Sequence, residues 1–324
     1  MQIAPELQGN LRQLRRQARR EKKKGRGRKI LMVIAAALAA VVVGAVAGYV
    51  WLLSLEGKMQ LAPKEVAKIN KVVVAPQGSG INMVLAGTDR RPNWTGSRAD
   101  TIMFIHADKE TKKVYMLSIP RDTRVMIPGR GMDKINHSWA FGGSSLLIKT
   151  VSDFMNQPVN YFFQVDFSRF EKAVDAMGGV DFATNLSWYD GELGVAVRPG
   201  LQHRSGKESL AIVRNRHVGP GGGGDMVRVP VQQQFIQAMV GQTIKSYADV
   251  PRAANIVASY VNTNMALAEM MGLGKDFAGQ GMQIETGVLP GRGIMINGIS
   301  YVTPDLGAKD AYVGAMLTNK PFPK

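Results

Sequence analysis

The feature that most constrains this chain is an uncharged apolar run of 24 residues, from Ile30 to Leu53, which directly follows a strongly basic start. A helix rises about 1.5 Å per residue, so a helix of this length spans a hydrocarbon layer of roughly 30 Å with some tilt. A cleaved signal peptide usually has a shorter apolar region, of about 7 to 15 residues, followed by a small-residue cleavage site. Here the run ends in Tyr-Val-Trp-Leu at residues 49–52, which is typical of an interfacial aromatic belt. We therefore predict a retained transmembrane helix over residues 30–53.

The basic residues are unevenly distributed along the chain. Residues 1–29 contain eleven Lys and Arg against Glu6 and Glu21, so this segment carries +9 of the formal net charge of +16. The excess of positive charge before the apolar run predicts a cytoplasmic N-terminus and an extracytoplasmic location for everything after Leu53. Orientation and attraction to anionic lipid account for such a cluster, so a nucleic-acid partner is not favoured. The absence of cysteine is consistent with export, and a domain of about 250 residues is large enough to be stable without disulfides.

The part after the apolar run alternates between strand-like and helix-like patterns without an internal repeat. This alternation predicts a single α/β domain in which a mixed β-sheet is sandwiched between α-helices. Strands are predicted at residues 81–87, 101–108, 114–120, 159–167, 180–182, 281–289 and 293–302, and helices at 137–156, 167–179, 207–213, 226–247, 250–260 and 263–277. The predicted organisation is a basic cytoplasmic tail (1–29), a transmembrane helix (30–53), a spacer (54–77), the α/β domain (78–310) and a C-terminal tail (311–324).

Polar residues that interrupt these patterns gather at strand ends and loop starts, where functional sites are usually built. The first such segment runs from Gly87 to Thr101 and contains Asp89 and Asp100. A pair of carboxylates facing each other across a loop suits Mg²⁺, which takes oxygen ligands and completes its shell with waters and phosphate oxygens. A solvated loop with salt-bridged charges is the alternative interpretation.

A second polar segment, Ser118 to Thr123, places an Arg and an Asp directly after a hydrophobic strand. A third, Lys134 to Gly143, has a Lys, an Asn and a His at the start of a predicted helix, where backbone N–H groups favour anions. The alternative for this third segment is a structural helix cap with a satisfied His137.

A fourth segment contains Arg214 and Arg216, followed by Arg228 and Gln232 four residues apart on one predicted helix face. Several guanidinium groups are suited to a diphosphate, because each binds oxygen atoms bidentately. The glycine-rich stretch between them lacks the Gly-Lys-Ser/Thr end of a P-loop. The histidines have no zinc-ligand spacing and there is no cysteine or GxSxG nucleophile, which argues against zinc hydrolases and acyl transferases.

The order and spacing of these segments resemble the LytR-CpsA-Psr family. The resemblance covers roughly residues 78–310 and rests on residues 89–101, SIPRDT, KINH, the segment 159–182, RNRH, and Asp225 with Arg228 and Gln232. Members of that family transfer glycopolymers, such as teichoic acids or capsular polysaccharide, from a polyprenyl-pyrophosphate carrier to peptidoglycan. The resemblance therefore implies a membrane-bound transferase that acts on a lipid-linked pyrophosphate with a peptidoglycan acceptor.

The resemblance also implies roles for individual residues. It makes Asp89, Asp100, Arg121 and Arg228 the catalytic residues. Asp89 and Asp100 are the Mg²⁺-associated carboxylates, one of which would orient or deprotonate the attacking sugar hydroxyl. The pyrophosphate-binding set is Arg90, Arg98, Arg121, Lys134, Asn136, Arg214, Arg216, Arg228 and Gln232. The candidates for an apolar pocket that holds the lipid are Phe154, Phe162, Phe167, Phe170, Val174 and Phe235.

The chain departs from the family pattern at Val231, where an Arg is common. Two other activities stay open at this point: a pyrophosphatase-type hydrolase acting on the same carrier, and a lipid-carrier-binding or regulatory protein without catalysis. Paired aspartates among many arginines favour catalysis, because a pure anion binder gains nothing from added negative charge unless a cation lies there. The sequence leaves open which glycopolymer and acceptor are used, which aspartate acts as base, and how many subunits assemble.

Overall fold

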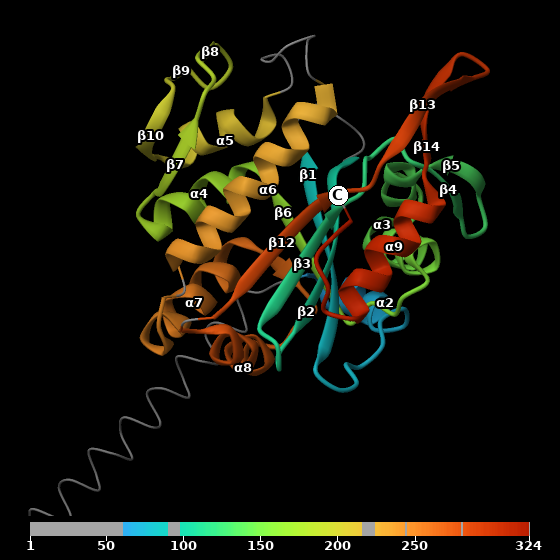
Figure 1. The fold of residues 1–324 in the computed structure, drawn as a ribbon, viewed down its shortest axis with the longest axis horizontal. Coiled ribbons are helices and arrows are strands. Elements are labelled where there is room, and N and C mark those ends of the chain that lie inside the picture. The colour runs from blue at the N-terminus through green and yellow to red at the C-terminus, as the bar shows by residue number, and fades with distance from the viewer. Residues whose placement is uncertain (1–60, 90–97, 216–223, 244, 280, 324) are drawn as a thin grey trace, which may run out of the picture. The chain divides into compact units, whose positions relative to one another are not determined.

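The computed structural model describes residues 61–89, 98–215, 224–243, 245–279 and 281–323 of the 324-residue chain (Figure 1). The predicted basic tail and the predicted transmembrane helix at 30–53 lie outside the described residues. Within the described ranges, no helix combines the length and the apolar character that crossing a membrane requires.

A six-stranded mixed sheet forms the centre of the domain, with the strand order β11-β6-β1-β2-β3-β12. β2 is antiparallel to both β1 and β3, β6 is parallel to β1, and β12 is parallel to β3. The carboxyl ends of β1, β3, β6 and β12 therefore meet at one edge of the sheet, beside the start of β2. The strands are β1 (Gly80–Asp89), β2 (Arg98–Asp108), β3 (Lys113–Ser118), β6 (Tyr161–Asp166), β11 (Asn262–Thr263) and β12 (Gln283–Val288).

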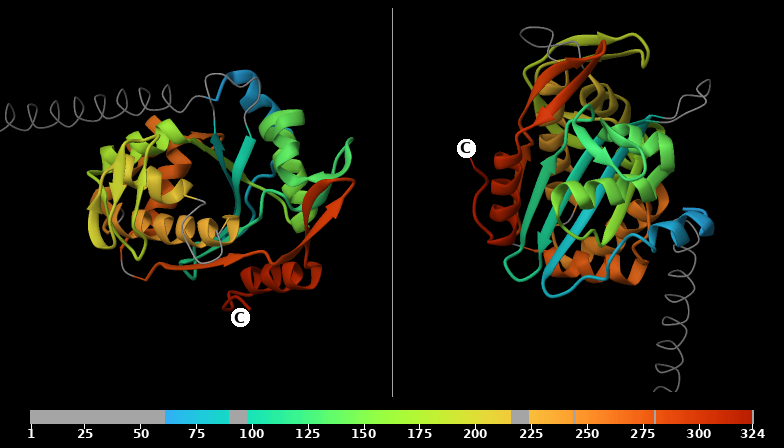
Figure 2. Two further views of the ribbon diagram at one scale, coloured as in Figure 1. Left: turned by 90° about the horizontal axis from the view of Figure 1, so that it is seen from above. Right: turned by 90° about the vertical axis from the view of Figure 1, so that its right-hand side faces the viewer.

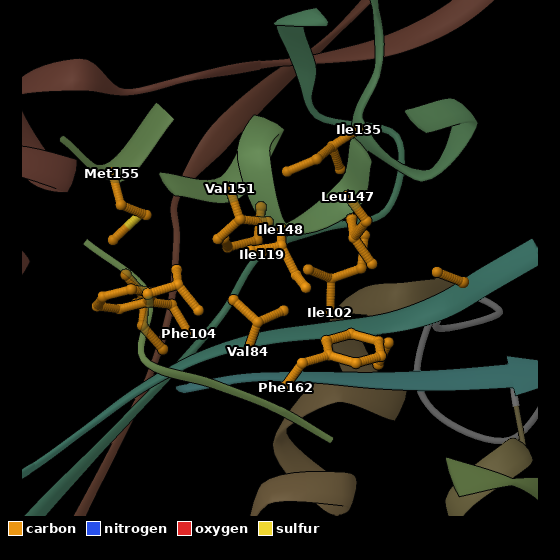
Figure 3. Close-up of a cluster of buried hydrophobic side chains, with 14 of the residues drawn as sticks. Val84, Ile102, Phe104, Ile119, Ile135, Leu147, Ile148, Val151, Met155 and Phe162 are labelled. Atoms are coloured by element: carbon orange, nitrogen blue, oxygen red, sulfur yellow. The ribbon is translucent and has the colours of Figure 1, made fainter. Parts of the chain in front are cut away.

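Helix α3 (Ile135–Met155) covers one face of the sheet. Figure 3 shows Leu147, Ile148 and Val151 of this helix packed towards the sheet residues Val84 and Phe162. Alternate residues of each strand point to this face, which gives a continuous apolar layer with almost no exposed surface. The helix is broken at Gly142 and Gly143, and the positive φ of Gly143 (65°) is a conformation that favours glycine.

Helices that follow β6 in the chain cover the opposite face of the sheet, as the yellow to orange ribbons in Figure 2 show. Two further apolar clusters lie on this side. One packs α4, α5 and α6 against short strands that lie outside the main sheet, and the other packs α8 against the main sheet. The prediction of a mixed sheet between helices is confirmed. The helices are α4 (Phe167–Met177), α5 (Gly206–Arg214), α6 (Gly224–Thr243), α7 (Val250–Tyr260) and α8 (Leu267–Phe277), and a 3-10 turn η2 (Tyr247–Asp249) precedes α7.

Four small two-stranded units surround the main sheet, and most of them were not predicted. The segment 183–206, expected to be loop, contains three short strands, and the expected strand at 293–302 is instead a hairpin. This hairpin turns at Asn297 and Gly298, which both have positive φ, as two-residue hairpin turns require. The units pair β4 (Arg124–Ile127) with β5 (Gly131–Lys134), β7 (Val180–Thr184) with β10 (Gly200–Arg204), β8 (Trp188–Asp190) with β9 (Val195–Val197), and β13 (Gly291–Ile296) with β14 (Ile299–Pro304).

The two ends of the described chain pack on the domain. The predicted boundary at residue 310 falls inside helix α9 (Leu306–Leu317), whose Val313 and Met316 belong to the α3 core cluster, so a tail does not begin at 311. Within the predicted spacer, helix α2 (Pro63–Ile69) buries Ile69 in the same cluster. The packed domain therefore begins before the spacer ends and continues beyond the predicted C-terminal boundary.

Candidate active site

The edge of the sheet where the parallel strands end carries the first candidate site residues. Gly87 pairs with Thr101 and Thr88 pairs with Ala99, so Asp100 is the extra residue of a β-bulge in β2. A bulge bends the strand locally and changes the direction of a side chain, which makes it a common device beside functional sites. The backbone of Asp89, the last residue of β1, pairs with Arg98, so the two aspartates lie on neighbouring strand ends.

Arg121, three residues after β3, faces the bulge. Its guanidinium Nη1 donates to Oδ1 of Asp100 at 2.5 Å, and its Nε lies 3.7 Å from Oδ2 of Asp122. The other carboxylate oxygen of Asp122 lies 2.9 Å from Nζ of Lys134. Two carboxylates thus hold the Arg121 guanidinium and the Lys134 ammonium close together at this edge.

Helix α6 closes the site from the other side of the sheet. Arg228 is only 3% exposed, and its Nη2 donates to the main-chain oxygen of Asp100 at 3.1 Å. Gln232 accepts a hydrogen bond from the hydroxyl of Thr101 (3.2 Å) and donates to the main-chain oxygen of Val213 (2.8 Å). Since Arg228 and Gln232 lie one helical turn apart, both reach the same edge of the sheet.

The start of α3 completes the cluster. The backbone N–H groups of Ile135 and Asn136 donate to the main-chain oxygens of Thr123 and Arg121, at 2.8 and 3.2 Å, which seats this helix end on the segment after β3. Asn136 is 4% exposed, and its side-chain oxygen has no hydrogen-bond partner in the described part of the chain. An amide can turn over to present its NH₂ group, so this buried side chain at a helix N-terminus is suited to a bound anion.

The departure at Val231 has a structural reason. Val231 packs against the apolar cluster that contains Phe235, Phe182 and Val174, so this position faces a hydrophobic neighbour while Gln232 faces the sheet edge. Pro230 lies within α6, which begins at Gly224, although a proline removes one backbone hydrogen bond there. The turn that carries Arg228 is therefore part of the helix.

Arg214, predicted to bind pyrophosphate, already has two acidic partners. Its Nε and Nη2 donate to the two carboxylate oxygens of Asp190 at 3.1 and 3.0 Å, and Nη2 also donates to Glu192 at 2.9 Å. Burial raises the pKa of Asp190, but hydrogen bonds from the Leu193 N–H and from Arg214 outweigh it and hold this pKa below its ordinary value. The structure thus ties Arg214 to the loop between β8 and β9.

The remaining predicted binding residues are described in part or not at all. Arg98 is exposed at the start of β2. Arg90 and Arg216 lie outside the described residues, and Asp89 is described through its backbone alone.

The six predicted lipid-pocket residues lie in two different clusters. Phe162 is completely buried on the α3 face, where its ring stacks with Trp139 (centroids 6.3 Å apart), and Phe154 packs at the edge of the same cluster. The other four lie on the opposite face of the sheet, where the rings of Phe170 and Phe182 tilt towards Phe235. These four are Phe167, Phe170, Val174 and Phe235.

Two residues of this site were not predicted. Asp122 was part of a motif but had no role, and Gln233 donates to the Ser118 hydroxyl (2.9 Å) and to the Gly287 main-chain oxygen (2.5 Å), which joins α6 to β3 and β12. The signal for Asp122 was its place directly after Arg121. For Gln233 the only signal was its position between two glutamines, Gln232 and Gln234.

Comparisons with known proteins identify the family to which the chain belongs. Residues 51–316 match the model of the LytR_cpsA_psr family. The polyisoprenyl-teichoic acid–peptidoglycan teichoic acid transferase TagU of Bacillus subtilis (strain 168) is 34% identical over 299 residues, which is 90% of this chain and 95% of TagU. TagU of Bacillus licheniformis is 32% identical over 294 residues, covering 88% of this chain and 94% of the relative.

Solved structures have the same fold. The crystal structure of B. subtilis TagU matches with a TM-score of 0.56 at 31% identity, covering 76% of this chain and 98% of TagU. B. subtilis TagV matches with a TM-score of 0.67 at 24% identity, covering 75% of this chain and 98% of TagV. YwtF (TagT), whose structure contains a bound octaprenyl pyrophosphate lipid, matches with a TM-score of 0.58 at 23% identity over 74% of this chain and 90% of that one. The chain belongs to the LytR_cpsA_psr family.

Proposed function

We propose that this protein is a membrane-anchored transferase that moves a teichoic-acid-like glycopolymer from a polyprenyl-pyrophosphate carrier to peptidoglycan, assisted by Mg²⁺. Relatives that are more than 30% identical over most of the chain are named as teichoic acid transferases, and the chain is a glycopolymer transferase of their class. The finer statements about the anchor, the metal and the site residues are our proposal.

One observation carries the proposal: cations from three distant segments meet at one edge of the sheet. Arg121 follows β3, Lys134 precedes α3 and Arg228 lies on α6. Arg121 and Arg228 both donate to Asp100 at the bulge, and Lys134 pairs with Asp122, which also lies beside Arg121. Burying a guanidinium such as that of Arg228 costs free energy, which a doubly charged ligand at the same place offsets. A diphosphate is such a ligand.

The chemistry needs positioning and charge neutralisation more than covalent participation. In phosphoryl transfer the attacking and leaving oxygens lie roughly in line, and negative charge is spread over the phosphoryl oxygens. Arg121, Arg228 and Lys134 are donors that neutralise this charge, and Asn136 adds a neutral donor beside them. The leaving group is the polyprenyl phosphate, so these donors act on the phosphate that departs as well as on the one that is transferred.

The carboxylates at this edge of the sheet are ligands that suit a magnesium ion. Mg²⁺ is usually held by one or two carboxylates together with waters and substrate phosphates, and Asp89 and Asp100 end and begin neighbouring strands at the same edge. In our proposal these two residues hold the ion. When bound, Mg²⁺ would supply further neutralisation of the pyrophosphate charge.

For the lipid chain we propose the face of the sheet opposite α3. Leu85, Ile105 and Phe163 are half-buried on this face, whereas Val84 and Phe162 on the α3 face have no exposed surface. Apolar side chains that are accessible beneath a layer of helices are suited to a hydrocarbon ligand. Of the predicted pocket residues on the helical side, Phe167 and Phe170 are also half-buried, whereas Val174 and Phe235 are completely buried in the cluster behind them.

The proposal is tested with the full chain in liposomes. A polyprenyl-pyrophosphate-linked teichoic acid precursor is supplied with uncrosslinked peptidoglycan, and joined product is separated from free glycan phosphate. We expect transfer that falls on addition of EDTA and returns with Mg²⁺, and a loss of about 10²-fold or more in Arg121→Ala and Arg228→Ala. Arg292→Ala, an exposed residue of β13, is the matched control and should transfer at the unchanged rate.

The assay distinguishes transferase activity from the two alternative functions. Release of free glycan phosphate without joined product would identify a hydrolase, and tight lipid binding without turnover would identify a carrier-binding protein. Wild-type transfer rates in both folded arginine variants would remove the proposal.

A further inference from the structure

His137 lies beside the candidate active site and has no role in the chemistry described so far. It occupies the first turn of α3, three residues after Lys134, and its side chain is 32% exposed. The backbone N–H of the preceding residue, Asn136, donates to the main-chain oxygen of Arg121. This turn of the helix is therefore in direct contact with the segment that carries the Arg121 guanidinium. His137 therefore belongs to the helical turn that contacts the Arg121 segment and that also follows Lys134.

A carboxylate fixes the orientation of the ring. Nδ1 of His137 lies 2.9 Å from Oδ2 of Asp133 on β5, and Oδ1 of Asp133 accepts from the backbone N–H of Lys134 (2.7 Å) and from the hydroxyl of Tyr301 (3.5 Å). Since a carboxylate only accepts, the proton of the neutral ring is on Nδ1, and Nε2 is left with its lone pair. The ring of Phe141 lies edge-on to the imidazole, with centroids 5.9 Å apart, and limits its rotation.

The carboxylate of Asp133 is in direct contact with the imidazole. Burial raises the pKa of Asp133, but hydrogen bonds from His137, the Lys134 N–H and Tyr301 outweigh it, so this pKa lies below its ordinary value and the carboxylate stays ionised. An ionised carboxylate at Nδ1 stabilises the imidazolium that forms when Nε2 takes a proton. Three cations lie on the surrounding elements: Lys134 pairs with Asp122 and lies over the ring of Tyr301, Arg124 also lies over that ring, and Arg130 lies over the ring of Phe141.

The aspartate at the bulge already binds the Arg121 guanidinium. Oδ1 of Asp100 accepts the short hydrogen bond from Arg121, and a proton placed on that oxygen would displace the guanidinium that the pyrophosphate needs. An oriented imidazole removes this conflict, because it is held by a carboxylate that has no contact with Arg121 in the described hydrogen bonds and ion pairs.

We propose that His137, oriented by Asp133, is the general base that deprotonates the acceptor hydroxyl of peptidoglycan. The proposal rests on the transferase function above. The hydroxyl oxygen forms a bond to the phosphorus that carries the glycan, and the bond between this phosphorus and the bridging oxygen breaks. The electron pair of that bond leaves with the polyprenyl phosphate, and the hydroxyl proton passes to Nε2 of His137 and then to solvent.

The test compares two histidines that make the same contact. His137→Gln removes the proposed base, whereas His203→Gln removes a ring whose Nδ1 lies 2.7 Å from Oδ1 of Asp181 on the pair β7–β10. Both variants of the full chain are assayed in liposomes from about pH 5 to about pH 9, the range in which a histidine changes its charge. Binding of octaprenyl pyrophosphate alone is measured in parallel.

We expect His137→Gln to lower kcat by about 10²-fold or more and to abolish the acidic limb of the pH profile. Octaprenyl pyrophosphate binding should stay within about two-fold, because a base for the acceptor has no contact with the donor. His203→Gln should keep the wild-type kcat and the wild-type fall of kcat at acidic pH. Asp133→Asn should move the limb to lower pH, since it removes the charge that stabilises the imidazolium.

The outcomes distinguish this inference from the function on which it rests. If the wild-type chain transfers glycan while His137→Gln keeps its kcat or its acidic limb, the inference is overturned and the transferase function stands. If His137→Gln does not fold, an unmoved limb in Asp133→Asn overturns it instead. If the wild-type chain itself transfers nothing, the proposed function fails first.

Discussion

Nη1 of Arg121 donates to Oδ1 of Asp100 at 2.5 Å, which joins the bulge in β2 to the segment after β3. Both side chains are mostly buried, so removal of either one takes a directly bonded, oppositely charged partner away from the other. The two residues should therefore act as a unit.

A double-mutant cycle tests this coupling. We expect Asp100→Asn and Arg121→Gln each to lower kcat/KM for transfer by about 10²-fold or more, and the double variant to be little worse than either single one. The measurement is the initial transfer rate with all three variants and the wild type. Losses that multiply in the double variant would show that the two side chains contribute independently.

The run of three glutamines on α6 provides a matched pair for stability. Gln233 is buried and joins α6 to β3 and β12, whereas Gln234 is exposed. We expect Gln233→Ala to lower the free energy of unfolding by about 1–3 kcal/mol, because buried acceptors lose their donor. Gln234→Ala should change it by less than about 0.5 kcal/mol. Urea unfolding measures the free energy of unfolding of both variants. Equal losses would contradict the conclusion that Gln233, and not Gln234, joins α6 to the sheet.

Two glycines differ in the space around them. A Cβ on Gly206 would lie 2.2 Å from the main-chain oxygen of Glu171, whereas a Cβ on Gly241 in α6 would meet no atom within 4 Å. Gly206→Ala should therefore destabilise the domain by about 1–3 kcal/mol through overpacking against backbone. Gly241→Ala should stabilise it by up to about 1 kcal/mol through helix propensity. A shift of both melting temperatures in the same direction would show that this local geometry is wrong.

A buried histidine predicts how stability depends on pH. Burial lowers the pKa of His106, and the nearby Asp108 opposes this shift only in part. Between the lower folded pKa and the unfolded value of about 6.5, the unfolded chain binds more protons, so the free energy of unfolding rises with pH in this window. Stability should therefore fall as the pH is lowered below about 6.5, and His106→Gln should weaken this dependence.

The control for this pH effect is His203, which is exposed and whose pKa is raised by its hydrogen bonds to Asp181 and Gly178. A group whose pKa is raised on folding has the opposite effect on the free energy of unfolding. The stabilisation that it contributes is lost as the pH rises through its folded pKa. Unfolding curves at several pH values measure both variants. A pH dependence of His106→Gln that matches the wild type would exclude the buried imidazole as its cause.

The sequence by itself determined the local elements and the inventory of chemical groups. The short apolar or alternating runs of β1 to β3, with turn residues between them, and the helical spacing of α3 predicted those elements to within a few residues. The motifs also identified Asp100, Arg121, Lys134, Asn136, Arg228 and Gln232, which meet at one edge of the sheet.

Only the tertiary structure decided which of these groups touch and which face of the sheet each one occupies. Thr101 and Gln232 are 131 positions apart, and Arg214 has acidic partners on a hairpin that the sequence pattern did not reveal. Phe162 and Phe170 look alike in the sequence but lie on opposite faces, because strand pairing and helix packing fix which way each side chain points. The physical reason is that register and packing are settled by contacts between distant segments, while local periodicity reports only the shape of one segment.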